Sequence, residues 1–248
     1  MKKVLFFLES LKGGGAEKVL LDIVKYLPVD EYQIKVMLVT DNGVYDEEIK
    51  NYCRQDLFDY YHKRSNPFVF VTTKIDITNI YDYCKIHKYH YATIAYVFGS
   101  AMNEIEEFKY RYENGKIYKY DKLNIGFTQM FKDGNIGYFT CSIKDNYKDF
   151  INEFKKTEEE FLITNKSIKK EGGELWVSCS PWYHFSSLVP PFDKNITIPQ
   201  LIWDKFELTD NKCFVNLMIM SHHGFTDGFH IGKLIEKINK NINEFVGN

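Results

Sequence analysis

One short turn organises the second half of the sequence. It reads Ser221-His222-His223-Gly224-Phe225-Thr226-Asp227-Gly228-Phe229-His230. The mostly apolar residues 213–220 before it predict a buried strand, and apolar residues at helical spacing over 231–246 predict a helix. Rigid elements on both sides hold a polar turn in place, so this turn is a candidate functional site. The alternative is a capped helix start with solvated histidines, and the full combination of residues favours a functional site.

The composition indicates a soluble globular protein with one sizeable core. The chain has 248 residues, of which 44% are hydrophobic and 27% charged, and its formal net charge is -2. We therefore expect no nucleic-acid partner and no membrane partner. The five cysteines form no CxxC pair, which argues against a disulfide framework or a zinc site and for a reducing, cytoplasmic location.

Residues 1–44 have a pattern of their own. A short apolar strand is predicted at 4–8, a glycine-rich loop at 13–15, a helix at 16–27 and a second strand at 34–39, which makes a partial βαβ unit. The glycines would let a phosphate approach a helix start, although a plain tight turn is the simpler interpretation. Residues 10–18 resemble the opening of bacterial GT-B glycosyltransferases. No second domain of that kind follows, so the resemblance implies ancestry or fusion more than glycosyl transfer.

From residue 45 onward the pattern predicts an α+β fold with a mixed sheet flanked by helices, because strands and helices do not alternate strictly. Helices are predicted at 46–61, 77–88, 91–105, 145–161 and 231–246. Strands are predicted at 67–76, 108–112, 116–120, 124–131, 136–142, 175–179, 196–204 and 212–220.

Four stretches between residue 45 and the end resemble the chloramphenicol acetyltransferase family. Residues 222–228 have the form HHxxxDG, which related dihydrolipoyl acyltransferases share, and residues 178–187 resemble a family segment SxxPWxxFxS. Residues 74–78 resemble its KIDIT segment and residues 49–61 its amino-terminal helix. The resemblance implies a two-layer sandwich of the kind found in CoA-dependent acyltransferases. It also implies a bacterial protein with acetyl-CoA as co-substrate, no metal, and a homotrimer with acceptor sites between subunits.

The resemblance also implies roles for individual residues. His223 would be the general base that removes the acceptor's hydroxyl proton, and Ser178 would donate a hydrogen bond to the developing oxyanion. Spacing alone would also allow a dyad between Asp227 and His223. The resemblance instead pairs Asp227 with Arg54 as a structural support of the turn, and Tyr61 would line the acceptor pocket.

Two neighbouring histidines have other expected roles. His222 is expected to be structural, and His230 to have a packing or surface role.

The leading hypothesis is an acetyl-CoA-dependent O-acetyltransferase that acts on chloramphenicol or a related small molecule. Residues 62–69 differ from the pocket wall common in the antibiotic-modifying members, so the sequence leaves the identity of the acceptor open. A dihydrolipoyl acyltransferase core is disfavoured because no lipoyl-type domain or Ala/Pro linker is present. A non-catalytic drug-binding protein and, from residues 1–44, a glycosyltransferase-related protein are the remaining alternatives.

Overall fold

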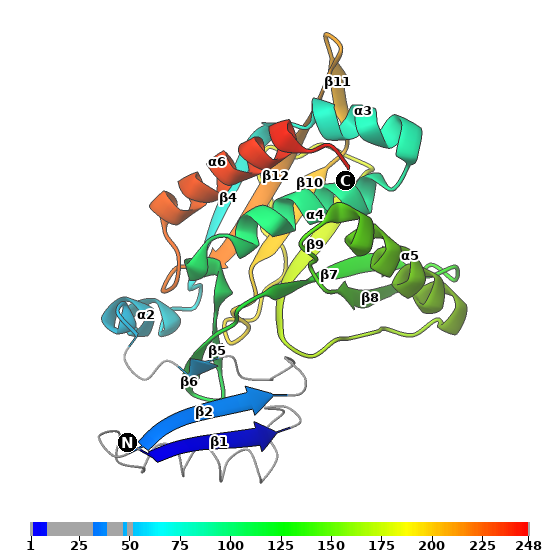
Figure 1. Ribbon diagram of the computed structural model, residues 1–248. Coiled ribbons are helices and arrows are strands. Elements are labelled where there is room, and N and C mark those ends of the chain that lie inside the picture. Colours follow the sequence, from blue (N-terminus) through cyan, green and yellow to red (C-terminus); the bar gives the residue numbers. More distant parts are fainter. Residues whose placement is uncertain (1, 9–31, 39–46, 49–51, 248) are drawn as a thin grey trace.

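The computed structural model describes residues 2–8, 32–38, 47–48 and 52–247 (Figure 1). The helices are α2 (Gln55–His62), α3 (Thr78–His87), α4 (His90–Asn103), α5 (Tyr147–Thr164), α6 (Gly228–Glu244) and the 3-10 helix η1 (Glu106–Lys109). The first strands are β1 (Lys2–Leu8), β2 (Tyr32–Leu38), β3 (Glu47–Glu48), β4 (Phe68–Asp76), β5 (Tyr110–Glu113) and β6 (Lys116–Lys119). The later strands are β7 (Leu123–Met130), β8 (Ile136–Cys141), β9 (Gly173–Ser180), β10 (Gln200–Asp204), β11 (Glu207–Thr209) and β12 (Lys212–His222).

The main sheet has seven strands and is mixed, which confirms the predicted α+β class. Its order is β11-β12-β10-β9-β7-β8, and β4 pairs with β12. β9 is parallel to both β7 and β10, whereas β12 is antiparallel to β4, β10 and β11. β12 therefore lies inside the sheet, with partners on both edges, and carries the histidine turn at its end.

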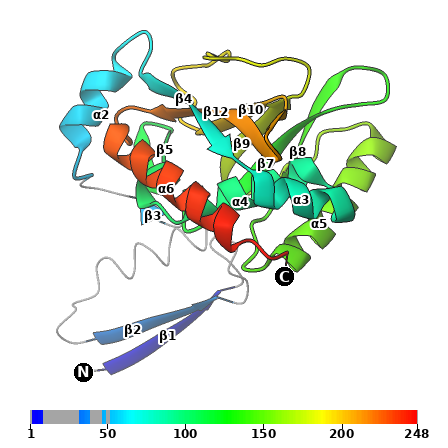
Figure 2. The same cartoon turned by 90° about the horizontal axis from the view of Figure 1, so that it is seen from above.

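The helices α3 to α6 cover one face of this sheet (Figures 1 and 2). The central helix α4 is buried along most of its length, because it packs against the sheet and also against its helical neighbours. Gly99 permits its close approach to β7, since a Cβ there would lie 2.8 Å from Cδ1 of Ile125. Trp203 of β10 and Phe98 of α4 meet in the core with ring centroids 5.8 Å apart.

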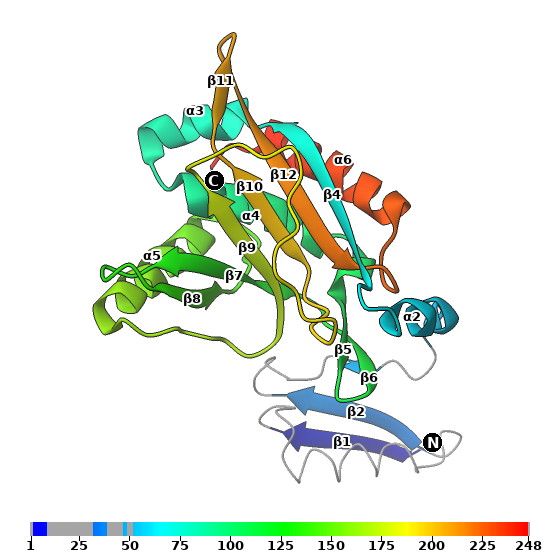
Figure 3. The same cartoon turned by 180° about the vertical axis from the view of Figure 1, so that it is seen from behind.

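The opposite face of the sheet is crossed by the segment 181–199 (Figure 3). Under it lies a second, smaller cluster of apolar side chains that includes Phe68, Phe185 and Met218. The protein therefore has two main layers, helices and sheet, and an irregular segment on the outer face of the sheet.

Two small sheets accompany the main one. β1 and β2 pair in parallel, with Lys2 opposite Tyr32, and the predicted helix at 16–27 and glycine loop lie outside the described residues. β5 and β6 form a hairpin whose two connecting residues, Asn114 and Gly115, have φ values of 49° and 81°. Positive φ at both positions suits the two-residue hairpin turn that matches strand twist.

Several predicted boundaries were wrong. The helix predicted at 46–61 begins only at Gln55, because residues 47 and 48 pair with the edge of β6 as β3. The strand predicted from residue 108 begins at Tyr110, after η1, and the one predicted from residue 196 begins at Gln200. β12 runs two residues further than predicted, to His222, so the turn starts at His223. β11 was not predicted.

No helix in the described part of the chain is both long and apolar enough to cross a membrane.

The helical layer supplies a direct test of the packing. Ile238 on α6 is 0% exposed, whereas Ile163 on α5 is 73% exposed. Ile238→Ala should lower the free energy of unfolding by about 2–5 kcal/mol, because it leaves a cavity in the core. The matched change Ile163→Ala should cost less than about 0.5 kcal/mol. Urea denaturation at one fixed protein concentration measures both, and equal effects would contradict this layer arrangement.

Candidate active site

The turn between β12 and α6 is closed by the first residues of α6. Asp227 is the N-cap: its Oδ1 accepts a hydrogen bond from the amide of Phe229 at 3.0 Å. The main-chain amide of Asp227 donates to Nδ1 of His230 at 3.2 Å, which completes a capping box. Nε2 of His230 then faces Oε1 of Glu107 at 3.3 Å. His230 is therefore part of the cap, a role that its position three residues after Asp227 could have indicated.

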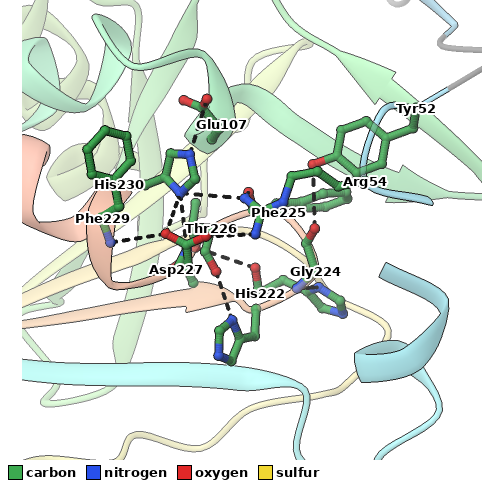
Figure 4. Close-up of polar contacts among 12 residues, drawn as sticks. Tyr52, Arg54, Glu107, His222, Gly224, Phe225, Thr226, Asp227, Phe229 and His230 are labelled. Carbon is green, nitrogen blue, oxygen red and sulfur yellow. Dashed lines mark hydrogen bonds and ion pairs between the residues drawn. The ribbon is translucent and has the colours of Figure 1, made fainter. Parts of the chain in front are cut away.

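Arg54 joins the residues before α2 to this turn (Figure 4). Its Nη2 lies 2.9 Å from Oδ2 of Asp227, and its Nη1 donates to the carbonyl oxygen of Phe225 at 2.7 Å. Burial acts to raise the pKa of Asp227, but the His230 ring, the Phe229 amide and Arg54 outweigh it and lower that pKa. Asp227 is thus held as a carboxylate between the guanidinium and the cap.

His223 is oriented by the main chain and by a neighbouring ring. Its Nδ1 lies 3.0 Å from the carbonyl oxygen of Thr226, and its amide donates to the carbonyl of Pro67 at 2.8 Å. A carbonyl only accepts, so the proton of the neutral ring sits on Nδ1 and Nε2 carries the lone pair. The ring of Tyr61 stacks on it, with centroids 4.1 Å apart and planes 16° apart. The half-buried ring therefore presents a basic nitrogen without a carboxylate partner on Nδ1.

His222 belongs to the interior. It is 1% exposed, stacks on Phe58 at 4.9 Å and accepts a hydrogen bond on Nδ1 from the amide of Gly224 at 3.1 Å. Burial, with smaller contributions from His62 and His223, lowers its pKa to about 3. A Cβ on Gly224 would lie 2.6 Å from Cα of Phe58, so the glycine allows α2 to pack directly on the turn.

Ser178 lies elsewhere on the sheet. On β9 it is opposite Ile202 of β10, which in turn is opposite Met218 of β12. Met218 precedes His223 by five residues. At normal strand spacings Ser178 is about 17 Å from His223 along the strands and about 10 Å across them. Within one chain the structure brings together Arg54, Tyr61, His223 and Asp227 and leaves Ser178 apart.

Ser178 nevertheless occupies a defined surface. Val177 beside it belongs to the core under the helices, so alternation along β9 directs Ser178 to the opposite face. Its cross-strand neighbour Ile202, and Met218 one strand further, belong to the cluster on that face. The half-buried serine therefore lies on the sheet face that carries no helices.

A cavity of about 720 Å³ lies on the helical side, between α4, the residues before α5 and the end of α6. Its lining includes Lys109, Lys122 and Glu104, but neither His223 nor Ser178. Among the described residues no group of three or more His, Cys, Asp or Glu side chains could hold a metal ion.

Comparison with known proteins adds the family. The model of the chloramphenicol acetyltransferase family matches residues 45–239. A chloramphenicol acetyltransferase from Staphylococcus aureus is 29% identical over 203 residues, covering 77% of this chain and 92% of that protein. A solved chloramphenicol acetyltransferase structure superposes with a TM-score of 0.67 at 19% identity, covering 82% of this chain and all of the other.

A probable dihydrolipoamide acetyltransferase from Listeria monocytogenes has a similar fold. It superposes with a TM-score of 0.58 at 17% identity, over 82% of this chain and 99% of the other.

The Arg54 contacts generate a prediction about the turn. Arg54→Met removes a charged hydrogen-bond donor from both Phe225 and Asp227, so it should lower the free energy of unfolding by about 1.5–3 kcal/mol. A matched control is Lys74→Met, which removes an exposed pair with Glu207 and should cost less than about 1 kcal/mol. Equal losses in urea denaturation would show that Arg54 does not support the turn more than a surface pair does.

Proposed function

The chain belongs to the chloramphenicol acetyltransferase family and is an acyltransferase, and we propose that it acetylates a hydroxyl of chloramphenicol or a related small molecule. Acetyl-CoA is the proposed donor and His223 the proposed general base. The observation that carries this proposal is the state of His223: its Nδ1–H is engaged by the Thr226 carbonyl and its ring is stacked on Tyr61. Nε2 is therefore left with the lone pair that a base requires.

In the proposed reaction Nε2 of His223 accepts the hydroxyl proton while the hydroxyl oxygen attacks the acetyl carbonyl carbon. The carbon–sulfur bond breaks, the ester forms, and the departing thiolate takes the proton back from the imidazolium. Such general base catalysis contributes about 10²–10⁴-fold. The acetyl group moves directly, without an acyl-enzyme. Asp227 supports the turn and does not relay the proton, a role to which its contacts with Arg54 and the cap are suited.

Ser178 is proposed to donate its hydroxyl hydrogen bond to the oxygen on which negative charge develops, an effect of about 10²–10³-fold. The separation of Ser178 from His223 within one chain supports an assembly in which each site uses both from different copies. We propose a homotrimer with the acceptor site between neighbouring subunits. Tyr61, which stacks on the base, would form one wall of that site.

We also propose that residues 45–248 form the catalytic domain and residues 1–44 a separate partial βαβ unit. The parallel pairing of β1 with β2 supports this division, because parallel neighbours need a crossover connection between them.

Thiol release from acetyl-CoA, with and without chloramphenicol, tests the reaction. We expect acceptor-dependent release that falls at least about 10²-fold in His223→Ala, because the base is lost. His87→Ala is the matched control: this histidine is exposed on α3 and stacks on Tyr83, and its loss should leave the rate unchanged. Drug binding without release for any hydroxylated acceptor would favour a non-catalytic binding protein instead.

Mixed subunits test where the site lies. His223→Ala and Ser178→Ala should each be nearly inactive alone. When the two are co-expressed, random assembly should restore about one quarter of the sites, because a Ser178→Ala copy supplies the base and a His223→Ala copy the serine. If both residues acted within one chain, no intact site could form and activity would stay at the level of the separate variants.

A further inference from the structure

The end of α2 contacts the histidine turn through two consecutive residues. Tyr61 stacks on His223, and the next residue, His62, places its Nδ1 3.4 Å from Nε2 of His222. Two neighbours on α2 thus meet the last residue of β12 and the first residue of the turn. Because they share one helical turn, the position of Tyr61 over His223 depends on where His62 is held.

The protons of this histidine pair follow from the surrounding donors. The amide of Gly224 donates to Nδ1 of His222, so in the neutral ring Nε2 carries the proton. That proton points towards Nδ1 of His62, which accepts it only while Nδ1 is unprotonated. Protonation of His62 would place its Nδ1–H against the Nε2–H of His222, and neither group could accept a hydrogen bond. The hydrogen bond therefore requires a neutral His62.

We propose that His62 is a positioning residue: its hydrogen bond with His222 holds the last turn of α2 so that Tyr61 stays stacked on His223, and protonation of His62 releases this contact. The inference rests on the proposed function, in which His223 is the base. His62 is the first residue of the stretch 62–69, which departs from the pattern of the antibiotic-modifying members.

The groups around His62 keep it neutral near neutral pH. Burial lowers its pKa, the cation of Lys194 from the outer segment lowers it further, and the carboxylate of Asp59 on α2 acts in the opposite direction. Across from it lie the buried His222 of β12 and the ring of Tyr112 on β5, whose centroid is 4.5 Å away.

The direction of the pH dependence follows from the lowered pKa of His62. Its neutral form is favoured in the folded protein, so the stability that the contact contributes is fully present above about pH 6.5, the ordinary histidine value. That stability declines as the pH falls from this value towards the lowered pKa of folded His62, and the contact itself is lost as the pH falls through that pKa. The turn should therefore loosen on the acidic side through a group other than the base itself.

Two substitutions separate positioning from packing. In His62→Asn, Oδ1 can take the place of Nδ1 as acceptor but does not titrate. In His62→Phe, the ring can still pack on Phe58 and Tyr112, but the buried Nε2–H of His222 has no acceptor. We expect His62→Phe to lower kcat about tenfold at pH 7.5 with little change in KM, and His62→Asn to recover most of that loss.

The experiment measures kcat against pH for the wild type, both variants and His87→Asn as an exposed-histidine control. It also measures the thermal midpoint of each protein from pH 8 to pH 5.5. His62→Asn should retain more activity than the wild type at the acidic end, and its midpoint should fall less with acid. His87→Asn should follow the wild type throughout.

Either of two results would overturn the inference. In the first, His62→Phe has the wild-type kcat and the same fall of kcat at acidic pH as the wild type. In the second, the thermal midpoints of His62→Asn equal those of the wild type at every pH. The midpoints need no activity, so the proposed function can fail separately. If the wild type transfers no acetyl group but its thermal midpoint still differs from that of His62→Asn at acidic pH, the proposed reaction is refuted and the proposed contact stands.

Discussion

The whole candidate site depends on one guanidinium that spans the turn. Arg54 holds both the carbonyl of Phe225, in the middle of the turn, and the carboxylate of Asp227, which ends it. In the five-residue connection 223–227 every amide already has a hydrogen-bond partner, whereas the carbonyl of Phe225 takes its hydrogen bond from Arg54. The charged donor therefore fixes two points of the connection at once and ties it to residues about 170 positions earlier in the chain. Without that donor, the carbonyl of Phe225 and the carboxylate of Asp227 would both lose a charged partner.

Two adjacent histidines of this arrangement have different surroundings. His222 ends the strand, lies in the interior and is kept neutral by burial. His223 leaves the strand, reaches the edge of the core and has its ring held by a carbonyl and by Tyr61. A shift of one residue in strand register would exchange their environments, because alternate residues face opposite sides. The nine-residue register of β12 on β4 prevents that exchange.

Much of the fold could be predicted from the sequence, because most elements are long and clearly periodic. The strand of Phe68–Asp76 and the helices over Thr78–His87 and His90–Asn103 were predicted to within a few residues. β3 was predicted as helix because its pairing with β6 is a tertiary contact that local pattern does not carry. For the site, spacing alone left Asp227 as a possible partner of His223. In the structure Nδ1 of His223 lies against the Thr226 carbonyl instead. The pairing of His62 with His222 spans 160 residues and has no local signal.

The distance between Ser178 and His223 has a kinetic meaning under the proposed assembly. A newly synthesised chain could fold completely and still be inert, since neither residue would face its counterpart until another copy arrived. Activity would then appear with a lag that shortens as the protein accumulates. In a cell that makes only traces of the enzyme, the activity per chain would be lower than in a cell that makes much of it. Expression level would then act on this enzyme as a threshold.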